Sequence, residues 1–316
     1  MEPSLVIVAG PTASGKSRLA LALAEALRGT IINADSMQVY RDLEVLTARP
    51  EPAALARAPH RLYGVIDAAE ACSAGRWRVL AMAEIAAARA AGRLPLLVGG
   101  TGLYIRALLD GLAPVPPVPA RLREEARALH ARLGGTDFHA ALAELDPETA
   151  NRLAPGDAQR LIRAFEVVLA TGRGLAAWQR DQSAPGIRAA AIVLLPPREA
   201  LYALCDARFL AMMAQGAEAE AAALLARRLS PTLPAMKAVG VRELGALLAG
   251  RMTREAAIAA AQQATRHYAK RQYTWFRRQL TDSASLRKLV VGEQFSESLL
   301  PEIFSFIRQF LLTTKV

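Results

Sequence analysis

The residues with the clearest chemistry lie near the start of the chain, where residues 10–17 read GPTASGKS. This is a complete G-x-x-x-x-G-K-[ST] pattern, in which backbone N–H groups surround phosphate oxygens, the lysine neutralises charge and the last hydroxyl can bind Mg²⁺. Its members are Gly10, Pro11, Thr12, Ala13, Ser14, Gly15, Lys16 and Ser17. An apolar run at 5–9 and an Ala- and Leu-rich helical pattern at 18–27 flank it, as expected of an anion site between a strand and a helix N-terminus. The segment predicts a site for a diphosphate or triphosphate group, and the motif alone favours ATP or GTP.

One acidic residue is well placed to act beside this site. Asp35 follows a second apolar run at 30–34, and Thr101 follows a third run at 94–98 and two glycines. Ligands of parallel sheets gather at the carboxyl ends of strands, so we expect both side chains near the phosphate loop. The run at 94–98 lacks the terminal acid that many P-loop phosphotransferases use to hold Mg²⁺. From the residues alone, Asp35 could bind Mg²⁺, act as a general base, or cap the next segment.

Another segment, residues 265–279 with the sequence TRHYAKRQYTWFRRQ, is typical of a nucleic-acid-binding helix. At about 100° per residue, two adjoining stripes carry most of the charge. They comprise His267, Arg271, Thr274 and Arg278, then Arg266, Lys270, Tyr273 and Arg277. The opposite side carries Tyr268, Gln272, Trp275 and Phe276, which we expect to face the core. We interpret the basic face as a phosphate-contacting surface, with an ordinary solvated face as the alternative.

Composition agrees with a polyanionic partner. The chain has 316 residues, a net charge of +10 and a pI near 10.2, which favours nucleic acid, although an Arg-rich genome would give the same bias. Its two cysteines, Cys72 and Cys205, show no metal-ligand or CxxC spacing, which argues against a zinc site or a disulfide framework. There is no signal-peptide pattern and no apolar run long enough to span a bilayer. We therefore expect a cytoplasmic protein without a membrane partner.

The order of the patterns predicts an α/β fold, a P-loop NTPase-like doubly wound parallel sheet with a helical insertion domain. We expect residues 1–112 to form the first part of the core, ending at a proline-rich joint, APVPPVP (113–119). Helical patterns follow, so residues 113–189 are interpreted as the insertion. Residues 190–280 return to the core and include the basic helix, and 281–316 form a C-terminal tail. The tail has an apolar helix face, expected to dock on the core, made of Ile303, Phe304, Phe306, Ile307, Phe310 and Leu311.

Several segments in the same order resemble the bacterial tRNA dimethylallyltransferases, also called tRNA isopentenyltransferases. They are GPTASGKS (10–17), NADSMQVYRDLEV (33–45), GGTGLYIRALLDG (99–111), DPETANRLAPGDAQRLIRAFEVVLATG (146–172), AVGVREL (238–244) and TRHYAKRQYTWFR (265–277). The resemblance implies transfer of a dimethylallyl group from its diphosphate ester to N6 of the adenosine just 3′ of the anticodon, in tRNAs that read codons starting with U. The phosphate loop would then hold the leaving diphosphate, with Mg²⁺ bound by Ser17 directly or through water.

The same resemblance assigns roles to individual residues. It implies that Asp35 is the general base, that Thr101 orients it, and that Arg208 contacts phosphate. It also implies that the chain has a surface that binds the anticodon stem-loop of tRNA. We expect the protein to act as a monomer. The implied tRNA contacts are Asp35, Ser36, Met37, Gln38, Thr101, Arg123, Gln159, Arg160, Leu161, Ile162, Arg163, Gly240, Arg242, Lys270, Arg271 and Arg277.

The chain departs from the family pattern at a few positions. Leu46 and Arg49 stand where the family usually has glycine and lysine, and His60-Arg61 replaces a histidine pair. Leu46 is the most doubtful change, because a glycine position often needs a positive φ. Two other functions remain open on the residues: a P-loop kinase of a small metabolite or nucleoside, and a non-catalytic RNA-binding ATPase. The basic helix disfavours the first, and the missing acid disfavours both.

Overall fold

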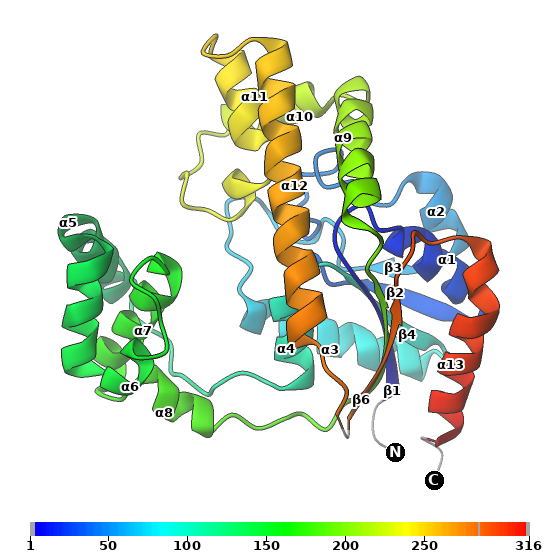
Figure 1. Ribbon diagram of the computed structural model, residues 1–316, viewed down its shortest axis with the longest axis horizontal. Coiled ribbons are helices and arrows are strands. Elements are labelled where there is room, and N and C mark those ends of the chain that lie inside the picture. The colour runs from blue at the N-terminus through cyan, green and yellow to red at the C-terminus, as the bar shows by residue number, and fades with distance from the viewer. Residues whose placement is uncertain (1–3, 284, 314–316) are drawn as a thin grey trace. The chain divides into compact units, whose positions relative to one another are not determined.

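The computed structural model describes residues 4–283 and 285–313 as a parallel sheet surrounded by helices (Figure 1). The strands are β1 (Ser4–Ala9), β2 (Gly29–Asn33), β3 (His60–Arg61), β4 (Leu94–Gly99), β5 (Arg188–Leu194) and β6 (Leu286–Val291). The helices before β5 are α1 (Lys16–Ala26), α2 (Pro52–Arg57), α3 (Ala74–Ala90), α4 (Gly102–Leu109), α5 (Ala120–Leu145), α6 (Pro147–Ala150), α7 (Ala158–Thr171) and α8 (Leu175–Arg180). Those after it are α9 (Arg198–Ala214), α10 (Ala217–Ala226), α11 (Val241–Leu248), α12 (Arg254–Gln279) and α13 (Leu300–Thr313), with 3₁₀ turns η1 (Ala235–Lys237) and η2 (Glu297–Leu299).

The six strands lie in the order β3-β2-β4-β1-β5-β6, and every pairing is parallel. The end of β1 is in register with its two neighbours, because Ala9 pairs with Gly99 of β4 and with Val193 of β5. The loops after β1, β4 and β5 therefore leave the sheet at one level and at one edge. This confirms the α/β, doubly wound fold expected from the sequence, and it places the phosphate loop at the strand where the winding direction reverses.

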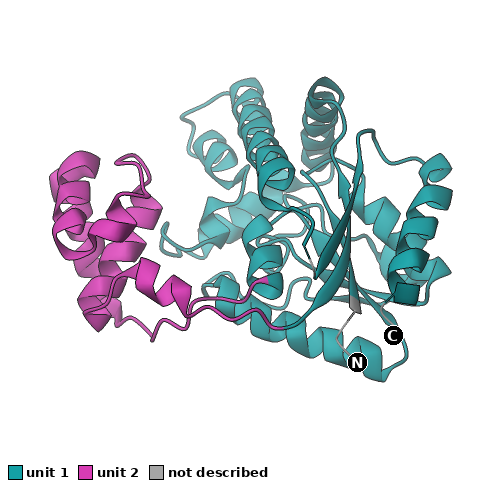
Figure 2. Ribbon diagram, turned by 60° about the horizontal axis from the view of Figure 1, so that its bottom comes forward, with its two compact units in different colours: residues 1–109, 186–316 teal, residues 110–185 magenta. Residues whose placement is uncertain are grey.

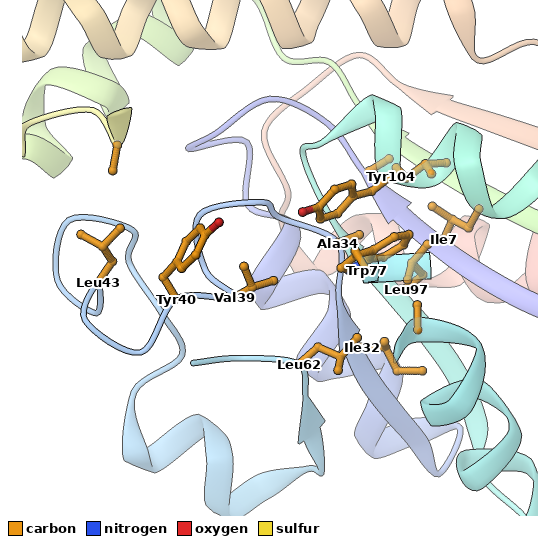
Figure 3. Packing of buried hydrophobic residues seen from close by; sticks show 14 of the residues in the cluster. Ile7, Ile32, Ala34, Val39, Tyr40, Leu43, Leu62, Trp77, Leu97 and Tyr104 are labelled. Carbon is orange, nitrogen blue, oxygen red and sulfur yellow. The ribbon is translucent and has the colours of Figure 1, made fainter. Parts of the chain in front are cut away.

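Both faces of the sheet are buried, which explains why its strands are continuous apolar runs. Alternate residues of β1 enter different cores: Leu5 and Ile7 pack with α3, α4 and α12, whereas Val6 and Val8 pack with α1 and α13. In the first core, the rings of Trp77 and Tyr104 are stacked with centroids 4.3 Å apart, beside Ile32 and Leu97 (Figure 3). Packing on both faces of the sheet thus fixes the positions of the carboxyl ends of the strands.

The chain forms two compact units, one of residues 1–109 and 186–316 and one of residues 110–185 (Figure 2). The second unit is helical and has its own core, built around Phe138, Leu142, Leu161 and Phe165. Its long helix α5 is interrupted at Gly134, whose φ of 75° is not helical. Helix α7 ends at Gly172, which has φ 63°.

The C-terminal residues contribute to the sheet itself. Residues 286–291 form β6, paired with β5 over six positions from Ala189↔Leu286 to Leu194↔Val291. Helix α13 then buries Ile303, Ile307 and Phe310. The apolar pattern predicted this docking helix, but it did not predict the strand before it.

Candidate active site and RNA-binding surface

The phosphate loop has the backbone shape of an anion cradle. Gly10 has φ +146° and Gly15, at the N-cap of α1, has φ +91°, and both values disfavour a residue with a side chain. A Cβ on Gly15 would also lie 2.9 Å from Cβ of Phe295. The Ser14 hydroxyl is buried, and within the described residues it has no hydrogen-bond partner. A buried, unpaired hydroxyl is costly, so this loop fits an additional polar ligand.

Two cations stand over the loop. Lys16 donates from Nζ to the carbonyl of Pro11 at 2.6 Å, and Arg208 on α9 donates to Oγ1 of Thr12 at 3.1 Å. Burial lowers the pKa of Lys16 to about 7; the charge of Asp35 opposes this shift and that of Arg208 adds to it. Burial also lowers the pKa of Arg208, opposed by Cys205 and Asp35. Two partly desolvated cations are strong partners for a diphosphate.

Asp35 lies beyond the end of β2 in a turn held by buried neighbours. Asn33 accepts the N–H of Asp35 at 2.8 Å and donates to the carbonyls of Asp35 and Leu62, at 3.0 and 3.1 Å. Trp77 donates to the carbonyl of Asn33 at 2.9 Å. Oδ1 of Asp35 accepts the N–H of Met37 at 2.9 Å, so the side chain does cap its own turn, as one sequence alternative expected. The turn leaves Asp35 half-buried, and its charge acts on both cations of the loop.

Thr101 lies beside the same turn. Its Oγ1 accepts the N–H of Ser36 at 2.9 Å and lies 3.3 Å from the Ser36 hydroxyl, while its own N–H donates to the carbonyl of Ala34 at 3.2 Å. Burial raises the pKa of Tyr268 on α12, the charge of Asp35 adds to this, and a side-chain hydrogen bond with Thr101 opposes it. The fold therefore brings Thr101 beside the Asp35 turn, and it brings Asp35 close enough to Lys16 and Arg208 for their charges to interact.

Of the remaining residues near Asp35, Ser36, Met37 and Gln38 are half-buried. The amide of Gln38 donates to the carbonyls of Thr47 and Ala48, at 2.9 and 3.0 Å. Met37 packs against the core. These contacts show that residues 35–38 form a structured rim rather than a free loop.

Helix α12 has the two faces that the sequence predicted, with two changes. Lys270, Arg271, Arg277 and Arg278 are exposed, whereas Gln272 and Phe276 are buried. Arg266 is not free, because it pairs with Asp206 at 2.6 Å. Tyr273 was expected among the cations, but it is half-buried and its hydroxyl lies 3.5 Å from the carbonyl of Leu195. The angular position of Tyr273 at the edge of the stripe explains this difference, since α9 packs there (Figure 1).

A cavity of about 640 Å³ opens beside the exposed face of α12. Arg242 of α11 and Arg271 of α12 both line it, with Lys237, Arg251 and His267. Gly240 has φ 97° and begins α11, where its N–H donates to Glu243 at 3.0 Å. Two segments that the sequence assigned separately to RNA therefore meet at one basic cavity.

In the helical unit, the candidate RNA contacts differ in exposure. Arg123 on α5 and Gln159, Arg160 and Arg163 on α7 are exposed. Ile162 is half-buried, and Leu161 is fully buried in the core of this unit. The side chain of Leu161 is therefore a packing residue and is not available for contact with RNA. Its place in the set came from the family resemblance, which covers the whole segment 159–163.

The departures from the family pattern are accommodated locally. Leu46 is buried and is not among the residues with positive φ, so the strain considered for this position does not arise. Its methyl group fills space beside Gly240. The N–H groups of residues 44–46 all donate to the carboxylate of Glu220, at 2.7, 2.7 and 2.9 Å. The guanidinium of Arg49 lies against Gly64.

Sequence reasoning missed three residues that contact the phosphate loop. Gln272 was assigned to the core side of its helix, yet it bonds to the loop; a lone amide among apolar and aromatic neighbours was the available signal. Gln294, after β6, donates to the carbonyl of Ala13 at 3.3 Å, and Phe295 packs on Gly15. The pattern LRKLVV (286–291) could have indicated the strand that brings them there.

Two negative findings concern only the described part of the chain. It contains no group of three or more His, Cys, Asp or Glu side chains arranged to hold a metal ion. None of its helices is long and apolar enough to cross a membrane. Ser17, the expected Mg²⁺ ligand, lies exposed in the first turn of α1.

Comparison with known proteins gives a consistent result. Residues 38–279 match the family model described as IPP transferase. The chain is 56% identical over 313 residues to a tRNA dimethylallyltransferase of Rhodospirillum rubrum, covering 98% of this chain and 95% of that protein. It is 54% identical over 310 residues to one of Paramagnetospirillum magneticum, with 98% and 97% covered.

Solved structures agree in fold. A tRNA isopentenylpyrophosphate transferase of Bacillus halodurans is 30% identical, with a TM-score of 0.70 over 99% of this chain and 98% of that one. A eukaryotic dimethylallyltransferase acting on tRNA superposes with a TM-score of 0.81 at 23% identity, covering 98% and 80% of the two chains. The second likeness supports the fold alone.

Proposed function

This chain belongs to the IPP transferase family of tRNA dimethylallyltransferases, and on that basis we propose that it prenylates tRNA. The substrate is dimethylallyl diphosphate, and the acceptor is N6 of the adenosine on the 3′ side of the anticodon in tRNAs that read codons starting with U. The products are N6-(dimethylallyl)adenosine and diphosphate. The comparisons give no support to the small-molecule kinase or the RNA-binding ATPase.

The single observation that carries this proposal is the meeting of an anion cradle and a carboxylate at one edge of the sheet. Lys16 and Arg208 stand over the loop, and Asp35 lies near enough for its charge to act on both. A kinase would need the same cradle and commonly an acid at the end of β4 to hold Mg²⁺. Prenyl transfer needs a proton acceptor and no such acid. Asp35 can accept the proton, and Thr101 lies beside it.

The reaction breaks the allylic C1–O bond and forms a bond between C1 and N6 of adenine. The electron pair of the broken bond leaves with the diphosphate, which the loop N–H groups, Lys16 and Arg208 stabilise electrostatically. Asp35 accepts the proton that N6 loses, and Thr101 holds the neighbouring turn in place. General-base assistance of this kind is typically worth ~10²–10⁴-fold. The adenine must leave its stack to reach Asp35, which costs a few kcal/mol.

The loop also fits Mg²⁺ bound together with the diphosphate. Within the described residues the buried Ser14 hydroxyl has no hydrogen-bond partner, and the Ser17 hydroxyl lies at the start of α1, directly after Gly15 and Lys16. Ser17 would hold the ion, directly or through water, and the ion would supply further neutralisation of the leaving diphosphate.

We assign the tRNA surface to the exposed cations of α12 with Arg242, and to Arg123, Gln159, Arg160 and Arg163 of the helical unit. Cations supply affinity by releasing counterions, while unstacked loop bases supply specificity. Since the substrate is tRNA, we place the enzyme in the cytoplasm, and we propose that it acts as a monomer.

The test incubates the protein with dimethylallyl diphosphate, Mg²⁺ and unmodified tRNA, followed by nucleoside mass spectrometry. The expected product is one dimethylallyl group on adenosine at the position 3′ of the anticodon. A parallel reaction with ATP and candidate nucleosides is the control. Absence of prenylated adenosine together with phosphorylation of a nucleoside would reject the proposal.

A further inference from the structure

One buried amide on the RNA-binding helix bonds to both loops of the active site. Gln272 of α12 is 6% exposed. Its Oε1 accepts the N–H of Thr12 in the phosphate loop at 2.8 Å, and its Nε2 donates to the carbonyl of Gly100 at 2.9 Å. Gly100 directly precedes Thr101. A single side chain therefore joins the loop that holds the diphosphate to the loop that borders Asp35.

Packing around this amide leaves it little freedom. A Cβ on Gly100 would overlap Nε2 of Gln272, and a Cβ on Gly102 would overlap the indole of Trp275. Tyr268, one turn before Gln272, hydrogen-bonds with Thr101. Residues 268, 272 and 275 share one side of the helix, and that side closes directly on the loop after β4. The exposed cations Lys270 and Arg271 lie on another side.

Thr12 is held from two directions. Its backbone N–H bonds to Gln272 of α12, and its Oγ1 bonds to Arg208 of α9. Helices α9 and α12 pack side by side over part of α12 (Figure 1). The conformation of the third residue of GPTASGKS is thus fixed by tertiary contacts and not by the loop alone.

We propose that Gln272 is a positioning residue of the donor site, which fixes the diphosphate loop relative to the Asp35–Thr101 side. This inference rests on the function proposed above. Gln272 does not touch the reacting atoms; it acts through Thr12 and Gly100. An anion cradle works only while its N–H groups converge on one point, so loss of this tie allows the loop to take other conformations and weakens diphosphate binding.

The physical reason is the cost of unpaired buried polar groups. Removing the amide leaves the N–H of Thr12 and the carbonyl of Gly100 without these partners, and such groups are expensive to leave unsatisfied. If the loop rearranges so that these groups find other partners, part of the free energy of diphosphate binding is used to restore the binding conformation. We expect the affinity for diphosphate to fall by about tenfold or more.

The experiment compares Gln272→Met, which keeps the length of the side chain but removes both bonds, with Gln263→Met. Gln263 is exposed on the same helix and serves as the matched control. Binding of inorganic diphosphate with Mg²⁺ is measured by calorimetry, tRNA binding by filter retention, and the Michaelis constants for donor and tRNA by prenyl transfer. We expect Gln272→Met to weaken diphosphate binding and raise the donor KM by about tenfold, with the tRNA dissociation constant unchanged. Gln263→Met should match wild type in every measurement.

Unchanged diphosphate affinity in Gln272→Met would overturn the inference. An equal loss of diphosphate and tRNA affinity would overturn it as well, because a general structural role predicts that pattern. If Gln272→Met does not fold, Gly100→Ala decides, since its Cβ displaces the same amide: selective loss of diphosphate binding supports the inference and wild-type binding overturns it.

The result is separable from the proposed function. A wild-type protein that binds diphosphate but does not prenylate tRNA rejects the proposed function, and the calorimetry still decides the role of Gln272. A wild-type protein that does not bind diphosphate rejects the donor site and this inference together.

Discussion

Two substitutions of Asp35 separate its proposed role as a general base from its structural role in capping its own turn. Its Oδ1 accepts the N–H of Met37 at 2.9 Å. Asp35→Asn keeps an oxygen at that position and removes only the basic carboxylate. Asp35→Ala removes the carboxylate and the hydrogen bond together. The pair of variants therefore distinguishes a general base from a residue that merely caps its turn.

The expected magnitudes follow from these contacts. Loss of a general base lowers the rate by ~10²–10⁴-fold, so the rate constant of prenyl transfer by Asp35→Asn should be lower than that of wild type by at least about a hundredfold. The additional hydrogen bond lost in Asp35→Ala is worth about 1 kcal/mol, which is roughly a further fivefold. If Asp35 only capped the turn, Asp35→Asn would match wild type and Asp35→Ala would lose about fivefold.

The assay is single-turnover prenyl transfer at saturating donor and tRNA, read by nucleoside mass spectrometry, with the tRNA dissociation constant measured separately. Saturating conditions remove differences in binding, so the rate constant reports the chemical step. Near-wild-type turnover by Asp35→Asn would refute the assignment of Asp35 as the base. A rate loss that disappears when the tRNA concentration is raised would refute it too, because weakened tRNA binding would then be its cause.

Two further predictions concern charge. Replacing Lys270 and Arg271 with alanine should weaken tRNA binding. It should also reduce the magnitude of the slope of log binding constant against log salt concentration by about 1.4, at about 0.7 per contact to single-stranded RNA. The control, Arg287→Ala with Arg308→Ala, also removes two exposed cations and should leave the slope unchanged; equal slopes in the two double variants would make the face of α12 an ordinary solvated surface. Lys16, whose pKa burial lowers to about 7, should regain its proton when the diphosphate anion binds, because a nearby negative charge raises its pKa. Above about pH 7, donor binding should therefore take up as much as one proton and weaken by at most about tenfold per pH unit. Calorimetry at about pH 8 in buffers of different ionisation enthalpy detects this uptake, and Lys16→Arg, which stays protonated, should lack it; identical uptake by the two proteins would contradict the assignment.

Local patterns were sufficient wherever the structure depends on contiguous residues. GPTASGKS predicted a turn between a strand and a helix, where Gly10 and Gly15 adopt backbone angles that glycine tolerates and Lys16 follows at the helix start. The apolar runs predicted β1, β2 and β4 because strands buried on both faces need no polar alternation. Angular spacing similarly separated the exposed Lys270 and Arg271 from the buried Phe276.

The same reasoning was unreliable where a side chain lies at the edge between two faces. Tyr273 and Arg266 belong by angle to the basic side of α12, yet residues of α9 pack on Tyr273 and pair with Arg266. Which side of a helix is covered depends on its neighbours, and a single helix does not contain that information.

By itself the sequence predicted the phosphate loop, the doubly wound fold and the basic helix, because each depends on residue types at short spacing, and its resemblance to known segments indicated the family. Only the tertiary structure revealed the further distant residues that contact the loop. Gln272 reaches Thr12 from a position 260 residues away, and Phe295 packs on Gly15 because β6 extends the sheet beside β5. Such contacts follow from strand order and helix packing, which set distances between segments that no local pattern relates.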